Sequence, residues 1–266
     1  MAGGMPVWPD ARRCEANVAA PTLATVIRLP RAARLTCWFT SWAYGRCSLD
    51  DARDGAVADD AAHDVLGLDD QPVPLVLALG QLRRRGAERA TLALPVPGDL
   101  VGLGGPPTFN TSALDAGEAV VLPGAGLGLV PSVVGAGVTW RASAADDGAV
   151  ADLGTAEVHL RDTLRETTTR LVDLDVARWR PEAATELLGL RRSHGEPLAP
   201  GHPARAQRLA ALALRCRAIV DLAQGDEGGS VSSYEVGQRL DALRQLERSA
   251  RHALVAACSA DPTAAG

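Results

Sequence analysis

The stretch VLPGAGLGLVP, Val121–Pro131, decides how the middle of this chain folds. Its three glycines, Gly124, Gly126 and Gly128, alternate with small or apolar residues. A dinucleotide-binding loop needs the pattern G-x-G-x-x-G after a strand and before a helix. Here the last position of that pattern is Leu129, and strand-forming residues follow instead of a helix. The stretch therefore predicts a β-hairpin, in which glycines supply positive φ angles and close approach, in preference to a phosphate cradle.

Further strands are predicted on both sides of this hairpin. The strongest strand pattern is Arg89–Pro97, where Pro95 and Pro97 indicate an end that lies at a sheet edge or leaves the sheet. Apolar or β-branched runs bounded by turn residues predict strands at 22–29, 63–68, 118–123, 127–134 and 137–143.

Helical patterns are interleaved with these strands. Leu35, Trp38, Phe39 and Trp42 share one face of a helix predicted after Pro30, which suits the first helical position. Short helices are also predicted over 49–57, capped by a serine, and over 74–86, which ends in three arginines and a glycine. The acidic segment 144–152 is predicted to be a linker or surface loop.

After residue 152 the pattern becomes helical. Leucines at helical spacing predict a helix that ends near Arg180, before a proline, and a second helix over 181–192. A Pro- and Gly-rich loop over 193–203 precedes an amphipathic helix that ends at Gly225. Ser232 and Glu235 match a capping box that opens a helix to Cys258.

The predicted fold class is α+β, with a mixed sheet and helices over 23–145 and an all-helical half of about four helices over 152–258. The two halves are expected either as one packed unit or as separate domains. Residues 1–22 and 259–266 are predicted to be a disordered extension and a disordered tail.

Composition excludes several chemistries. All 27 basic residues are arginine, so Schiff-base, P-loop and kinase-type lysines are absent. The net charge is −5 and no segment concentrates positive charge, which argues against nucleic-acid binding. No apolar run reaches membrane-spanning length and no signal-peptide pattern opens the chain, so we expect a cytoplasmic protein with reduced cysteines.

Histidines and cysteines lack metal-ligand spacing, and we expect neither a metal nor a cofactor. His194, Glu196 and His202 share one loop, but two solvated histidines are the preferred interpretation. His63 and Asp64 are adjacent on a predicted strand and so point to opposite faces.

Two kinds of candidate site remain. The Gly- and Pro-rich loop after the Arg89–Pro97 strand offers Asp99 and Asn110 as ligand-binding residues, and we expect Arg141 to face them. Arginine and tryptophan, which are enriched at interface hot spots, gather in two places. The predicted interaction residues are Arg34, Trp42, Arg178, Trp179 and Arg180, against core tryptophans with ion-paired arginines as the alternative.

The sequence favours a non-catalytic interaction or regulatory protein with an unidentified protein partner. The alternative is a small-molecule-binding protein or an enzyme with its site at the loop after Pro97. Binding of DNA or RNA by the C-terminal helices is the least favoured hypothesis.

Overall fold

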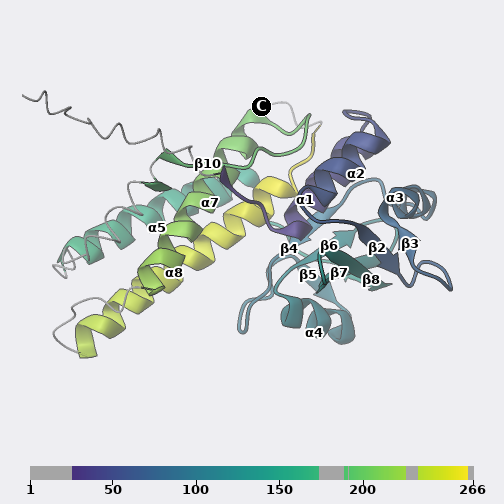
Figure 1. Cartoon of the computed structure of the whole chain (residues 1–266). Coiled ribbons are helices and arrows are strands. Elements are labelled where there is room, and N and C mark those ends of the chain that lie inside the picture. The colour runs from purple at the N-terminus through teal and green to yellow at the C-terminus, as the bar shows by residue number, and fades with distance from the viewer. Residues whose placement is uncertain (1–25, 174–188, 191, 226–232, 263–266) are drawn as a thin grey trace, which may run out of the picture.

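The structure is a computed structural model that describes residues 26–173, 189–190, 192–225 and 233–262. The described chain is a mixed α+β fold (Figure 1). Its helices are α1 (Arg31–Ala43), α2 (Leu49–Val57), α3 (Leu75–Arg84), α4 (Pro107–Ala116), α5 (Leu153–Asp173), α7 (Ala204–Gly225) and α8 (Ser233–Cys258).

One six-stranded mixed sheet organises the N-terminal half, in the order β3-β2-β8-β7-β6-β4. The β2–β8 pair is parallel and the other neighbours are antiparallel. The strands of this sheet are β2 (His63–Leu66), β3 (Val73–Pro74), β4 (Thr91–Ala93), β6 (Ala119–Leu122), β7 (Leu127–Val134) and β8 (Gly137–Ala144). The predicted strand over Arg89–Pro97 is confirmed in its centre, and it lies at the sheet edge.

The two faces of the sheet bury different clusters. Val120 and Leu122 of β6 belong to the large core cluster with α1 and α3, whereas Ala119 and Val121 belong to a small cluster with Phe109 of α4. This alternation is what a strand buried on both faces requires. In Figure 1, α1 to α3 accordingly lie on one side of the sheet and α4 on the other.

The predicted hairpin is confirmed. β6 and β7 pair antiparallel, with Leu122 opposite Leu127, and Gly124 and Gly126 have φ angles of +84° and +63° in the turn. Gly128 has a different role, because a Cβ atom built on it would lie 2.2 Å from Cζ of Phe109. The third glycine of the stretch therefore makes room for the α4 side of the core.

The segment after Pro97 was predicted to be a long loop, but the end of this segment forms a helix. Pro107 opens α4, with Pro106 as its N-cap and Gly117 as a left-handed C-cap. Proline at the first helical position fits, since its missing N–H is not needed there. Before this helix, β5 (Leu103–Gly105) pairs with β9 (Asp146–Asp147), so the acidic segment is tied to that loop.

The C-terminal half contains the long helices α5, α7 and α8, which run side by side away from the sheet (Figure 1). It is not purely helical, because β10 (His194–Gly195) pairs in parallel with β1 (Val26–Ile27). The predicted helix over 181–192 and the cap at Ser232 lie largely or wholly outside the described residues.

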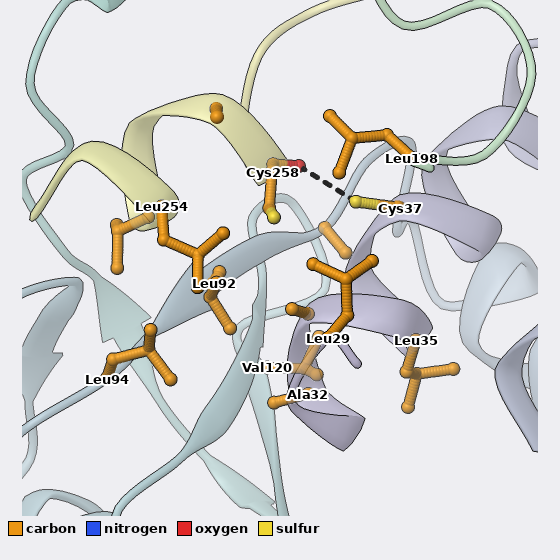
Figure 2. Packing of buried hydrophobic residues seen from close by; sticks show 14 of the residues in the cluster. Leu29, Ala32, Leu35, Cys37, Leu92, Leu94, Val120, Leu198, Leu254 and Cys258 are labelled. Atoms are coloured by element: carbon orange, nitrogen blue, oxygen red, sulfur yellow. Dashed lines mark hydrogen bonds between the residues drawn. The ribbon is translucent and has the colours of Figure 1, made fainter. Parts of the chain in front are cut away.

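The end of α8 is buried in the N-terminal core. Leu254 and Cys258 pack beside Leu92 of β4 and Cys37 of α1 (Figure 2). The Cys37 thiol lies 3.8 Å from the carbonyl oxygen of Cys258. Ser259 is also buried, and its hydroxyl accepts the Leu92 N–H at 2.9 Å. Ser259, the first residue of the tail predicted over 259–266, is therefore packed against the sheet.

Substitutions at two glycines test the hairpin packing. We expect Gly128→Ala to lower the free energy of unfolding by about 1–3 kcal/mol, because the new methyl group overpacks the Phe109 cluster. Gly237→Ala is the matched control, since Gly237 lies in α8 with no neighbour within 4 Å of a built Cβ. It should stabilise the protein by about 0.5–1 kcal/mol. Urea denaturation measures both, and equal effects at the two positions would contradict this assignment of Gly128.

Candidate functional site

A cleft of about 540 Å³ lies where the N-terminal and C-terminal halves meet. Its volume is in the range of small-molecule sites. The cleft is lined by the start of β4, the β6–β7 turn, the acidic segment, the starts of α5 and α7 and the end of α8. The lining residues are Arg89, Thr91, Pro123, Asp147, Gly148, Val150, Ala151, Asp152, Leu153, Gly154, Pro203, Arg205, Ala256, Ser259, Ala260 and Asp261.

The acidic wall of the cleft is held by close backbone packing. Cβ atoms built on Gly104 and Gly148 would lie 2.2 Å from the Asp147 carbonyl oxygen and 2.1 Å from the Gly102 carbonyl oxygen, respectively. Glycines are therefore needed on both sides of this contact. The loop that the sequence singled out after Pro97 acts here as the support that positions Asp147.

Hydroxyl groups form the buried floor beside β4. Thr91 is 3% exposed and lines the cleft, and its side chain makes no hydrogen bond within the described residues. The Ser259 hydroxyl accepts a hydrogen bond from the Leu92 N–H and keeps its own proton to donate. The Thr91 oxygen is not one of the fully buried side-chain atoms without a partner, so it is accessible and can bond with a polar ligand.

Arg89 provides positive charge at the same end of β4. Its guanidinium is exposed and forms no hydrogen bond or ion pair with any residue that the structure describes. By contrast, Arg205 at the start of α7 is bound to Glu157, with 2.6 Å between Nε and Oε2. Arg89 is therefore the cation of the cleft that is available to an anionic group.

No hydrogen bond or ion pair joins the predicted ligand residues Asp99, Asn110 and Arg141 to one another within the described residues. Asp99 is not in the cleft lining, and β7 and β6 separate the strand of Arg141 from β4. Asn110 lies on α4, where its side-chain oxygen is buried without a partner.

Asp99 instead fastens the loop after β4 to α8. Its Oδ2 lies 2.7 Å from Nε2 of His252, 3.0 Å from Nη2 of Arg251 and 3.2 Å from Nε of Arg248. Burial opposes ionisation, but His252 and Arg251 outweigh it and hold the pKa of the Asp99 carboxyl below its usual value. The carboxylate is thus occupied by the chain's own cations.

A second, partly buried network surrounds Asp60. Arg31 holds both carboxylate oxygens, at 2.9 and 2.8 Å, and His63 Nε2 lies 3.1 Å from Oδ2. The Trp140 indole donates to Nδ1 of His63 at 3.3 Å, so Nε2 carries the proton that is donated to Asp60. The carboxylate partner of His63 is therefore Asp60, three residues earlier, and not the adjacent Asp64. The alternation of side chains along a strand could not predict this pairing, because Asp60 lies before the strand.

The interaction residues predicted from the sequence separate into three cases. Arg34 is buried and its Nη2 lies 3.3 Å from Asp60, so it is not an interface side chain. Trp42 is partly buried, and the guanidinium carbon of Arg83 lies 5.0 Å from its ring centroid. Arg178, Trp179 and Arg180 lie outside the described residues.

Burial raises the pKa of the Cys37 thiol well above its usual value, which makes it a poor nucleophile. No group of three or more metal-ligating side chains occurs among the described residues. Among the described helices, none is long and apolar enough to span a membrane.

The fold and the cleft define a two-part α+β protein with a candidate site at the junction of its parts. Residues 32–153 match the family model of the Rv1486c-like protein N-terminal domain, and residues 154–255 match that of the Rv1486c-like protein C-terminal domain. The two matches follow one another along the chain, so both halves of it are similar to the Rv1486c-like proteins.

Two relatives from Mycobacterium tuberculosis are similar over most of the chain. They are "Uncharacterized protein Rv1486c" of strain ATCC 25618 / H37Rv and "Uncharacterized protein MT1533" of strain CDC 1551 / Oshkosh. Each is 29% identical over 280 residues, covering 85% of this chain and 95% of the relative. No solved structure matches the chain.

The Asp60 network predicts a specific dependence of stability on pH. Hydrogen bonding from Arg31 lowers the pKa of the Asp60 carboxyl from 3.8 to about 2. A lowered folded-state pKa stabilises the protein fully above the unfolded value, and that contribution is lost as pH falls from about 4 toward 2. We expect Asp60→Asn to reduce the acid slope of stability in this window.

The same variant should lower stability at pH 7 by about 3 kcal/mol, because the buried Arg34 loses the carboxylate that it shares with Arg31. Asp59→Asn is the control, since Asp59 is 74% exposed and pairs with Arg28 at the surface. Urea denaturation at a series of pH values measures both effects. An acid slope that is unchanged in Asp60→Asn would contradict the assignment.

Proposed function

We propose that this protein binds a small polar molecule in the cleft between its two halves and acts as a non-catalytic, regulatory binding protein. The observation that carries the proposal is the uncommitted polar lining, above all the unpartnered Thr91 hydroxyl beside the Arg89 guanidinium. Groups of this kind can bond with a ligand in exchange for water, without breaking hydrogen bonds within the protein.

Binding fits the lining better than catalysis does. The sixteen lining residues include no histidine or cysteine, the side chains most used as general bases and nucleophiles at neutral pH. The site differs from the small-molecule site expected from the sequence, because it lies at the start of β4 and not at the loop that follows Pro97.

A regulatory role is supported by the origin of the cleft walls. Arg89 and Thr91 belong to the segment that matches the N-terminal domain, whereas Arg205 belongs to the segment that matches the C-terminal domain. A ligand that contacts both walls would bias how the two halves pack, which is the requirement for a ligand to shift a conformational equilibrium.

An arginine exchange in the cleft tests the proposal. Thermal-shift screening of the full chain against nucleotides, amino acids and small carboxylates should raise the melting temperature with at least one class of compound. Arg89→Gln should then weaken binding of that compound by about 10- to 100-fold, the equivalent of one charge-assisted hydrogen bond. Isothermal titration calorimetry measures the affinity.

Arg84→Gln is the matched control, because Arg84 is also exposed, at the end of α3, and lies outside the cleft lining. It should leave the affinity unchanged. A compound that binds both variants as it binds the wild-type protein would show that the cleft is not its site.

Interaction with a protein partner, the function favoured by the sequence, is the second candidate. The feature that supports it is Trp42, a partly exposed ring with the Arg83 guanidinium over it, since this pair of residue types is enriched at hot spots. A cytoplasmic location is part of the same proposal. Recovery of the same partners by the wild-type chain and by a folded Trp42→Ala variant would argue against it.

A further inference from the structure

Some charged side chains of the cleft are already bonded within the protein, whereas others are available to bind a ligand. Arg205 is paired with Glu157, and Oδ1 of Asp152 accepts the N–H groups of Gly154 and Thr155, at 2.8 and 3.1 Å, at the start of α5. These contacts hold the cleft wall in place. Because Arg205 and Asp152 already have partners within the protein, they are less available to a ligand.

Asp261, which follows α8, also has a partner within the protein. Oδ2 of Asp261 lies 3.2 Å from the hydroxyl of Tyr44, so this acid ties the segment after α8 to the segment after α1. Among the charged lining residues, Arg89 and Asp147 are left without a side-chain hydrogen bond or ion pair in the part of the chain that the structure describes. No ion pair joins these two side chains to each other.

The helix ends give the cleft a matching polarity. The start of α7, a helix of 22 residues, contributes Pro203 and Arg205, and its first N–H groups carry partial positive charge. The end of α8, a helix of 26 residues, contributes Ala256, and its last carbonyl groups carry partial negative charge. An anionic group and a cationic group are therefore both favoured within one cleft.

From this arrangement we infer that the ligand is a small zwitterion, with a carboxylate or phosphate group bound by Arg89 and an ammonium group bound by Asp147. The inference rests on the proposed function, that the cleft binds a small polar molecule. A ligand with negative charge alone would face the carboxylates of Asp147 and Asp261, and one with positive charge alone would face Arg89 and Arg205. The buried hydroxyl groups of Thr91 and Ser259 bind its uncharged polar atoms.

Three probes of equal chain length separate the two charges. 6-Aminohexanoate carries both, hexanoate carries the anion alone and hexylamine carries the cation alone, and 4-aminobutanoate samples a shorter separation between the charges. We expect the better of the two zwitterions to bind the full chain at least tenfold more tightly than hexanoate or hexylamine, as measured by isothermal titration calorimetry.

Two variants test which residue binds each charged group of the ligand. Asp147→Asn should remove the preference for the zwitterion over hexanoate and leave hexanoate binding in place, whereas Arg89→Gln should weaken both at least tenfold. Asp146→Asn is the matched control, because Asp146 is the neighbouring exposed residue of β9 and lies outside the cleft lining. Circular dichroism confirms that each variant is folded.

The outcomes distinguish the two proposals. If the zwitterions and hexanoate bind equally, or if Asp147→Asn changes neither, the zwitterion inference is overturned and the cleft remains a binding site. If hexylamine alone binds, the assigned role of Arg89 is overturned as well. If none of these probes and no compound of the wider screen binds, the proposed function fails together with the inference.

Discussion

The edge of the central sheet is closed by residues from distant parts of the chain, and Ser259 at the end of α8 is one of them. Ser259 accepts the Leu92 N–H on the side of β4 that faces away from β6, and these two residues are 167 positions apart. An uncovered edge strand is a template for association with other chains. The last turns of α8 cover this one with a row of buried small and apolar residues, Ala253 to Cys258. The N-terminal sheet therefore depends on a C-terminal helix for its completion.

The same packing of α8 against β4 also forms the cleft. The end of α8 reaches β4, and the starts of α5 and α7 then stand around the space beside Arg89 and Thr91. Asp147 enters this space because glycine backbones pack at van der Waals contact beneath it. The site thus combines parts that match two different family domains, and neither part holds a complete set of lining groups by itself.

The sequence predicted those elements whose signal is local. The Gly124–Gly126 turn, the apolar face of α1 and the edge position of β4 all follow from spacing and turn chemistry within a few residues. The helix after Pro107 was missed because consecutive prolines indicate a loop, although proline suits a helix start equally well. The parallel pairings β2–β8 and β1–β10 were out of reach, since they join distant segments and leave no periodic signal.

The candidate site was predicted less well than the fold. Asp99 was singled out as a polar residue on a functional-looking loop, and its real partners, Arg251 and His252, lie in the last helix. Arg89 and Thr91 looked like ordinary residues of a strand, because only the returning α8 gives them a cleft to face. The signal that could have found them is three-dimensional, namely which polar groups remain unpartnered after the chain has folded.

The pairing of β1 with β10 has a consequence for how the chain is made. The Leu29 N–H donates to Glu196 at 2.9 Å, again across 167 residues, so an early segment completes the helical half just as a late one completes the sheet. At the usual pace of translation, the first strand leaves the ribosome roughly ten to thirty seconds before its partner is synthesised. During that interval the nascent sheet has an open edge and the early strand has nothing to pair with. We therefore expect the two halves to complete their native packing only after α8 has been synthesised.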